Sequence, residues 1–241
     1  MSDNNEKEKS VNMDLKLKNN EYYAIIDRNP ISISYAQSGY LDDAVKIPKN
    51  RFYKVSWEQF KKDAEKLILP YLNDHNLYTA LDFDDNGELL KSTYDSITLP
   101  RRSTKRSAGY DFYIPFDKIP LYPGESIVIP TGIKMELTPT CYLALYPRSS
   151  YGFKYKMRLD NTVGIVDADY YNNKNNEGHI MIKISCELEP PKFTVLNHAI
   201  PILTLDRNAK FAQGIITLYG VTDDDEPCDS ERTGGIGSTG K

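Results

Sequence analysis

The sequence has few cysteines and no long apolar run, and these shortages exclude several classes of protein. Its 3 cysteines, Cys141, Cys186 and Cys228, lie far apart and lack C-x-x-C spacing, which disfavours both a disulfide framework and a structural zinc site. No segment approaches the roughly 18 consecutive apolar residues of a membrane-spanning helix, and the polar N-terminus lacks the apolar centre of a signal peptide. We therefore expect a soluble cytoplasmic protein without membrane contact.

An excess of positive charge is also missing. The chain carries 30 Lys and Arg residues against 34 Asp and Glu residues, which gives a formal net charge of −4. A broad basic face for nucleic acid is therefore not expected, although a few arginines in one pocket can hold a small polyphosphate. Because 40% of the 241 residues are hydrophobic, the chain can bury a core. We expect a globular protein that binds small anions and no nucleic acid.

The N-terminal part contains two kinds of sequence. Residues 1–21 are rich in Asn, Lys, Glu and Asp and are predicted to form a disordered tail. Residues 22–98 begin with two β-like segments, Tyr22–Ile26 and Ile31–Tyr35, and continue with a helical pattern. They are predicted to form a small α/β domain of unknown role.

The helical pattern starts at a recognisable signal. Ser56 and Gln59 have the spacing of a capping box, in which each side chain bonds the backbone N–H of the other residue. Pro70 is expected to end or kink the helix. Apolar residues recur at helical spacing and predict a side that faces the core: Phe60, Ala64, Leu67 and Ile68.

The sequence pattern changes near residue 99 from helical periodicity to short β-like segments. Residues 99–230 consist of short strands punctuated by Gly and Pro, which predicts a mainly β domain: a sandwich, a barrel or a jelly roll. Residues 231–241 form a glycine-rich arm that is unsuited to a core but can close backbone N–H groups over phosphates. Gly235–Lys241 fits the start of a P-loop, yet the strand before it and the Ser or Thr and helix after it are missing. A P-loop NTPase is therefore disfavoured.

Five short motifs follow one another in this β-rich part: Ala108–Phe112, Pro147–Ser150 with Gly152 and Lys154, Asn161–Tyr170, Lys210–Gln213, and the arm from Arg232. Together they resemble the motifs of the trimeric deoxyuridine triphosphatase (dUTPase) family. The resemblance implies an enzyme that hydrolyses dUTP to dUMP and pyrophosphate, a β-clip or jelly-roll subunit, and a homotrimer whose chains share each active site. Residues 170–173 and 231–233 are most similar to members from low-GC Gram-positive bacteria and their phages.

The resemblance gives Asp167 the role of general base. Hydrolysis of a phosphoanhydride needs a water molecule in line with the α-phosphorus, and an ionised carboxylate can accept the proton of that water. Asp169 is the second candidate, because two residues that are two apart share one side of an extended strand. The metal implied is Mg²⁺, carried by the triphosphate without a direct protein ligand, and Asp111 would hold a metal-bound water.

The remaining site residues are implied by the same resemblance. Asn161 and the backbone of Gly164, Ile165 and Val166 would bind uracil, with a main-chain contact from Met181. The ring of Tyr170 would exclude a 2′-hydroxyl group. The phosphates and the closing arm would involve Arg148, Ser149, Ser150, Gln213, Arg232, Gly237 and Ser238, with Ile236 where many members carry an aromatic residue.

Two alternatives stay open. A dCTP deaminase shares the fold and uses a glutamate on the strand after the uracil hairpin, but Lys183 occupies the comparable position and a cation cannot act as that base. A regulatory module would keep the fold and bind a protein partner through its N-terminal domain.

Overall fold

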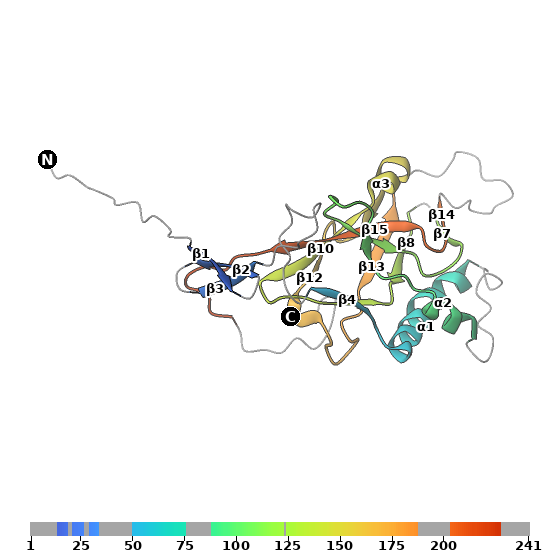
Figure 1. Cartoon of the computed structure of the whole chain (residues 1–241). Coiled ribbons are helices and arrows are strands. Elements are labelled where there is room, and N and C mark those ends of the chain that lie inside the picture. The colour runs from blue at the N-terminus through green and yellow to red at the C-terminus, as the bar shows by residue number, and fades with distance from the viewer. Residues whose placement is uncertain are drawn as a thin grey trace. The chain divides into compact units, whose positions relative to one another are not determined.

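The computed structural model describes the backbone of residues 14–18, 21–26 and 29–33, and residues 50–75, 88–122, 124–187 and 203–227 in full (Figure 1). Contacts divide the chain into two compact units, Met1–Lys49 and Asn50–Lys241.

The first unit contains an antiparallel sheet of three strands in the order β1-β2-β3. β2 (Glu21–Ile26) and β3 (Asn29–Ile33) lie where the sequence predicts strands. β1 (Asp14–Lys18) lies within residues 1–21, for which the sequence predicts a disordered tail. The sequence of β1 alternates charged and leucine residues, a period of two that suits a strand although the surrounding composition is polar.

The second unit is built mainly from antiparallel strands, as the sequence predicts. Its largest sheet has the order β12-β10-β15-β6-β5. A three-stranded sheet has the order β11-β13-β8, and two further pairs are β14 with β7 and β4 with β9. The strands of the large sheet are β5 (Arg101–Arg102), β6 (Tyr110–Tyr113), β10 (Cys141–Pro147), β12 (Gly164–Val166) and β15 (Lys210–Leu218). The others are β4 (Arg51–Lys54), β7 (Ile119–Leu121), β8 (Ser126–Pro130), β9 (Ile133–Glu136), β11 (Met157–Leu159), β13 (Met181–Cys186) and β14 (Leu203–Leu205).

The core of this unit lies between the sheets. In β13, buried Ile182 and Ile184 alternate with exposed Lys183, which is the pattern of a strand with one side on the core. Among the largest side chains of the core are Phe112, Phe116, Ile129, Met135, Leu143 and Phe211.

Helix α1 (Trp57–Asp74) begins at the predicted signal, but only half of the capping box forms. The Ser56 hydroxyl accepts a hydrogen bond from the Gln59 N–H at 3.1 Å. The Gln59 side chain instead donates to Asp63, and the Ser56 N–H donates to the carboxylate of Glu177 at 3.0 Å. A distant residue therefore completes the cap.

The buried side of α1 agrees with the sequence pattern: Phe60, Ala64 and Ile68 are buried and Leu67 is half-buried. Pro70 does not end the helix, which continues to Asp74. The last turn buries Leu72 and donates a hydrogen bond from the Tyr71 hydroxyl to the Pro120 carbonyl at 2.8 Å. These tertiary contacts stabilise the helix beyond the proline.

The described residues 50–98 belong to the second unit, whereas the sequence predicts a division near residue 98. β4 pairs with β9, and α1 packs against β8 and against α2 (Glu88–Asp95). Phe60 stacks on Phe116 with ring centroids 5.8 Å apart. An apolar helix side predicts burial, but the sequence does not show that the surface covering it lies in the β domain.

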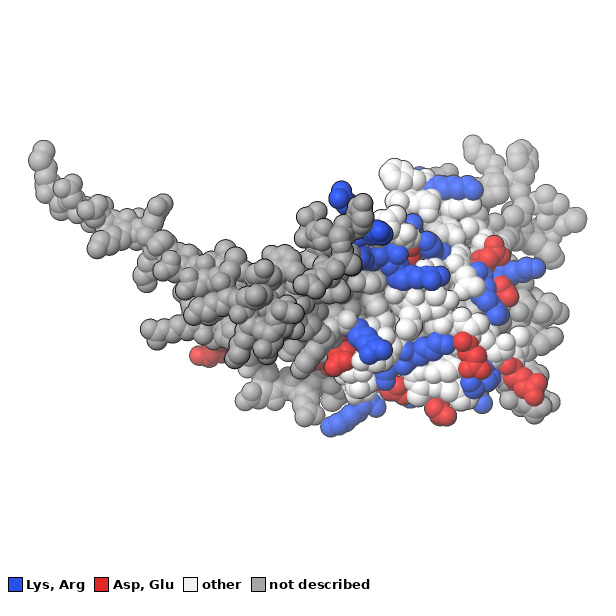
Figure 2. Space-filling model, in the orientation of Figure 1, with Lys and Arg blue, Asp and Glu red and all other residues white. Residues whose placement is uncertain are grey.

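On the face drawn in Figure 2, Lys and Arg side chains of the described residues are interspersed with Asp and Glu side chains and with uncharged areas. None of the helices in the described ranges combines the length and the apolar character that a membrane crossing requires.

Candidate active site

The first, second and fourth motifs meet around one buried carboxylate, Asp111. Asp111 on β6 is only 1% exposed and lies opposite Gln213 on β15. Its Oδ1 lies 2.8 Å from Nη1 of Arg148, and its Oδ2 lies 3.1 Å from Nζ of Lys210. Ser103 donates a further hydrogen bond to Oδ2. We call Ser103, Asp111, Arg148, Lys210 and Gln213 the Asp111 cluster.

Two opposing effects act on the Asp111 carboxyl group. Burial raises its pKa, because a charge is less stable away from water. The hydrogen bonds from Ser103 and Lys210 and the positive charge of Arg148 outweigh burial, so the net pKa lies below the usual value. The cluster therefore keeps an ionised carboxylate that holds Arg148 and Lys210 in place.

Arg148 joins the end of β10 to a short helix. Its backbone N–H donates to the carbonyl of Phe211 at 3.0 Å, which fixes the turn at which α3 (Ser149–Tyr155) begins. Ser149 and Ser150 open this helix and are exposed, so their hydroxyl and N–H groups are accessible. The turn thus presents one guanidinium and two serines on the surface.

Gln213 is held close to the first motif. Its Nε2 donates weakly to the carbonyl of Pro147 at 3.4 Å. A Cβ atom on Gly109 would lie 2.6 Å from Oε1 of Gln213, closer than real contacts allow. The glycine of the first motif therefore leaves the space that the glutamine side chain occupies.

The third motif lines a pocket of about 720 Å³, which we call the nucleoside pocket. All six residues that the sequence assigns to uracil and deoxyribose line it: Asn161, Gly164, Ile165, Val166, Tyr170 and Met181. Strand β12 supplies the glycine and the two aliphatic residues, and Met181 begins β13. The structure therefore gathers in one cavity residues that lie up to twenty positions apart.

Tyr170 is fixed on its polar side. Only 9% of it is exposed, and its hydroxyl donates to the carbonyl of His179 at 2.9 Å while accepting from Nδ2 of Asn176 at 2.7 Å. Because the hydroxyl has both a donor and an acceptor, the ring has one preferred position at the pocket wall.

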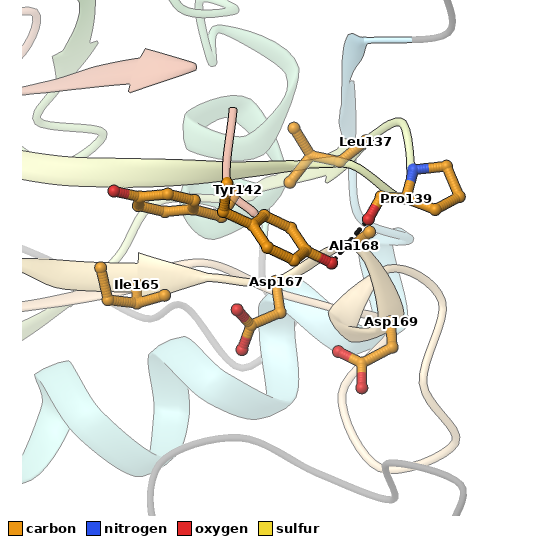
Figure 3. Close-up of a pocket in the computed structure, with 8 residues that line it drawn as sticks. Leu137, Pro139, Tyr142, Ile165, Asp167, Ala168 and Asp169 are labelled. Carbon is orange, nitrogen blue, oxygen red and sulfur yellow. Dashed lines mark hydrogen bonds between the residues drawn. The ribbon is translucent and has the colours of Figure 1, made fainter. Parts of the chain in front are cut away.

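Asp167 lines a second pocket, of about 680 Å³, together with Asp169, Tyr142 and Tyr219 (Figure 3). Asp169 does not lie on an extended strand, as the sequence suggested, because residues Ala168–Tyr170 form a turn of 3₁₀ helix, η2. Both carboxylates nevertheless line this pocket. Ile165 borders it as well as the nucleoside pocket.

The Asp111 cluster and the Asp167 pocket lie at opposite ends of β10. The register pairs Leu143 with Val166 and Pro147 with Ala212. Tyr142 beside Asp167 and Arg148 beside Asp111 are six positions apart, which corresponds to roughly 20 Å at the rise of a strand. Within one chain the two groups of residues are therefore well separated along this strand.

A sequence model of the dUTPase family matches residues 95–240. The chain belongs to the dUTPase family. It is 37% identical to the deoxyuridine 5′-triphosphate nucleotidohydrolase of Lactococcus lactis over 145 residues, which cover 60% of this chain and 89% of that enzyme. It is 33% identical to the enzyme of the same name from Paraburkholderia phymatum over 151 residues, covering 59% and 89% of the two chains.

Two solved dUTPase structures are also similar. The dUTPase of Streptococcus mutans has 31% identity and a TM-score of 0.44, and the match covers 52% of this chain and 88% of that one. The dUTPase of Staphylococcus bacteriophage 80alpha has 20% identity and a TM-score of 0.43, and covers 56% and 92%. The prediction that the protein is an enzyme of this family is confirmed by the family match and the relatives.

The described residues do not include four that the sequence assigns to the closing arm: Arg232, Ile236, Gly237 and Ser238. Within the described ranges, no group of three or more His, Cys, Asp or Glu side chains could hold a metal ion. Lys183 lines the nucleoside pocket, and its Nζ lies 3.0 Å from Oδ2 of Asp160.

Sequence reasoning missed the contribution of helix α1 to this dUTPase pocket. Lys62, Asp63 and Lys66 all line the nucleoside pocket. One signal was available: Asp63 falls between Phe60 and Ala64 on the apolar side of the helix, where a charged residue needs a partner. The identity of that partner, His179, was not readable from the sequence.

Proposed function

We propose that the protein hydrolyses dUTP to dUMP and pyrophosphate. The observation that carries this proposal is the nucleoside pocket, in which the third dUTPase motif contributes Asn161, the β12 backbone and Tyr170 to one cavity. The edge of a strand offers fixed N–H and C=O groups that can pair with one base edge. A base with the wrong donor pattern leaves buried groups unpaired, at a cost of about 1–3 kcal/mol each.

Asp167 is proposed as the general base. Its carboxylate accepts a proton from a water molecule while the oxygen of that water attacks the α-phosphorus, and the bond to the bridging oxygen breaks so that pyrophosphate leaves. Its place supports this role, because Asp167 directly follows the strand that lines the nucleoside pocket. Tyr170 is proposed to exclude a 2′-hydroxyl group by the position of its ring.

The Asp111 cluster is proposed to bind phosphate. Arg148 offers a planar pair of donors, and Ser149 and Ser150 offer hydroxyl and N–H groups. Gln213 adds an amide near the same turn, and the arm residues Arg232, Ile236, Gly237 and Ser238 are proposed to close over the substrate.

Mg²⁺ is proposed to arrive with the triphosphate, where it would neutralise phosphate charge. Asp111 fits an indirect contact with it. Its buried Oδ1 lies near Arg148, but no donor among the described residues is aligned to make a hydrogen bond to it. That oxygen could therefore accept a hydrogen bond from a water of the metal. With Arg148 and Lys210 beside it, the carboxylate is unsuited to direct ligation.

A homotrimer with shared active sites is proposed as the working form. The separation of roughly 20 Å along β10 between the Asp167 pocket and Arg148 supports it, because a second copy must then supply the phosphate-binding turn. Exposed apolar side chains are available for contact between copies, among them Phe153 at 92% and Val221 at 69% exposure. Light scattering should give three times the chain mass of 27.5 kDa, and a monomer with full activity would contradict this proposal.

A cytoplasmic location and an origin like that of the Gram-positive and phage enzymes are predicted from the sequence alone. A protein partner of the N-terminal part also stays a prediction. Because α1 and β4 are occupied by the β domain, residues 1–49 are the part to test for such a partner.

The decisive experiment is pyrophosphate release from dUTP, UTP, dTTP and dCTP, with and without Mg²⁺. We expect release from dUTP in the presence of Mg²⁺ and little from the others. Analysis of the dCTP reaction for deaminated product separates the deaminase alternative. Conversion of dCTP to a uracil nucleotide, or equal release from all four substrates, would overturn the proposed function.

A further inference from the structure

Helix α1 contacts the segment after the third motif at two points. At its N-terminus, the Ser56 N–H and hydroxyl both donate to the Glu177 carboxylate, which also pairs with Lys134 at 3.0 Å. Two turns further along the helix, Oδ2 of Asp63 lies 2.6 Å from Nδ1 of His179. Both contacts fall within residues 170–181, the connection between Tyr170 and Met181 of the nucleoside pocket.

The contact between Asp63 and His179 has one preferred arrangement of hydrogens. The N–H of Gly132 donates to Nε2 of His179 at 2.7 Å, so Nε2 is an acceptor and carries no proton. The ring proton therefore lies on Nδ1 and is donated to Asp63. His179 is fully buried and Asp63 is 5% exposed, so loss of either partner leaves a polar group unpaired in the core.

This pair is connected to Tyr170. The backbone carbonyl of His179 accepts the Tyr170 hydroxyl at 2.9 Å, and the next residue, Ile180, is fixed by hydrogen bonds to Thr131 and Ile133. A change in the position of the His179 backbone therefore moves the acceptor that sets the ring of Tyr170. The connection therefore runs from Asp63 on α1 through the side chain and the backbone carbonyl of His179 to the hydroxyl of Tyr170.

Asp63 also borders the nucleoside pocket itself. It lines the nucleoside pocket together with Lys62 and Lys66 of the same helix. The family match begins at residue 95, so this wall comes from a part of the chain outside it. Asp63 is buried, and its Oδ2 accepts a hydrogen bond from Nε2 of Gln59 at 2.7 Å in addition to its contact with His179. These contacts hold the Asp63 carboxylate in place, so that it can position His179.

We propose that Asp63 is a positioning residue for sugar selection: through His179 it holds Tyr170 where the ring excludes a ribose 2′-hydroxyl. The inference rests on the proposed function, because it deepens the account of the same pocket. Asp63 does not touch the reacting atoms and acts only through His179.

The first test compares Asp63→Ala with Glu65→Gln. Glu65 is on the same helix, is exposed and does not line the pocket, so its variant should behave as the wild type. For Asp63→Ala, we expect the ratio of kcat/KM for dUTP to that for UTP to fall about tenfold. We expect this fall to come mainly from a higher KM for dUTP and better use of UTP. Asp63→Asn keeps an acceptor for Nδ1 and should restore most of the ratio.

A double-mutant cycle tests the path itself. Tyr170→Phe removes the hydroxyl that binds the His179 carbonyl but keeps the ring. If Asp63 acts through that hydroxyl, Asp63→Ala should change the selectivity of the Tyr170→Phe enzyme far less than that of the wild type. Additive effects, or Asp63→Ala with the selectivity of Glu65→Gln, would overturn the inference.

Two controls keep the result interpretable. If Asp63→Ala does not fold, the same cycle is measured with Asp63→Leu, which fills a similar space but offers no acceptor for Nδ1 of His179, and the same criterion of non-additivity applies. Failure of the wild type to hydrolyse dUTP would contradict the proposed function. Wild-type hydrolysis with unchanged selectivity in the folded variants that lack the acceptor, Asp63→Ala or Asp63→Leu, would contradict only this inference.

Discussion

At the level of single residues, the two carboxylates that matter most for the proposed chemistry have opposite surroundings. Asp111 is buried and held between Arg148 and Lys210, which suits a group that positions others. Asp167 is half-buried and lines an open pocket, where it can meet a water molecule. Positioning and proton transfer are thus assigned to different acids.

The exchange of Asp167 for asparagine should lower kcat for dUTP by about 10²–10⁴ while KM changes little, because the shape stays and the proton acceptor is lost. Steady-state kinetics of pyrophosphate release gives both constants. Asp169→Asn, in the same pocket, is the matched control and should keep most of its activity. A larger loss for Asp169→Asn than for Asp167→Asn would transfer the base role to Asp169.

Glu177 should make stability depend on pH. Burial raises its pKa, but hydrogen bonds from Ser56 and the contact with Lys134 outweigh burial and leave the pKa below its usual value of 4.5. Since the folded state favours the ionised form, its stabilising effect is present above the usual pKa and is lost as pH falls through the lower folded value. The wild type should therefore be more stable than Glu177→Gln at pH 7, with the difference shrinking below pH about 4.5.

Urea unfolding of both proteins between acidic and neutral pH measures this difference. Subtraction of the two curves removes the contribution of other acids such as Asp111, which are common to both. A difference that stays constant over the whole range would show that the charge of Glu177 does not support the helix cap.

At the level of elements, the turn between β8 and β9 receives helix α1. Gly132 has φ of +74°, its N–H donates to His179 and its carbonyl accepts from Val55. A Cβ atom there would lie 2.3 Å from Cδ1 of Ile97 and 3.3 Å from the ring of Phe60. The turn therefore needs glycine both for its backbone and for the space under the helix.

Gly132→Ala should destabilise the fold more than Gly124→Ala. Gly124 has a nearly identical φ of +75°, but nothing lies within 4 Å of its added Cβ. Both variants carry the backbone strain of about 1–2 kcal/mol, and Gly132→Ala adds about 1–3 kcal/mol from overpacking. Urea unfolding measures the difference in stability between the two variants from their midpoints, provided that the slopes are equal. An equal loss of stability in both variants would show that α1 and Ile97 shift to make room for the added methyl group.

Local signals in the sequence were sufficient for several elements. The alternation in β13 and the cap at Ser56 depend on neighbouring residues, and both are present in the structure. Part of the third motif also lines one pocket, because β12 and the residues beside it form one short local unit: Asn161, Gly164, Ile165, Val166 and Tyr170. Contacts between distant parts were not predictable: the partners of Asp63 and Ser56 lie more than a hundred residues away. Pro70 likewise remains helical because of tertiary contacts that its neighbours do not encode.

At the level of the whole molecule, the part that matches the family is not the part that folds as a unit. The match begins at residue 95, whereas the compact unit begins at Asn50. The intervening residues add a strand to β9 and bury a set of apolar side chains: Phe52, Val55, Phe60, Ile68, Leu72 and Leu90. Removal of this part would expose their partners in the β domain.

Deletion of residues 2–49 should leave a folded and active enzyme, whereas deletion of residues 2–98 should give an aggregating protein. The reason is that the second deletion uncovers Phe112 and Phe116, which contact Phe52 and Phe60. Circular dichroism, thermal unfolding and dUTP hydrolysis compare the two. A soluble, active protein after the longer deletion would restore the predicted boundary near residue 98.

The long separation between helix α1 and its partners also affects how the chain is made. Asp63 and His179 are 116 residues apart, so at about 5–20 residues per second a ribosome adds the second residue roughly 6–23 seconds after the first. During that interval Asp63 lacks its partner His179, although segments that cover the apolar side of the helix, such as Phe116 and β8, are already made. Synthesis at low temperature or with slow codons lengthens the time during which Asp63 lacks His179. A chaperone that binds amphipathic helices would reduce the aggregation of the chain during that time. The yield of soluble protein should thus depend on how quickly the segment around His179 leaves the ribosome.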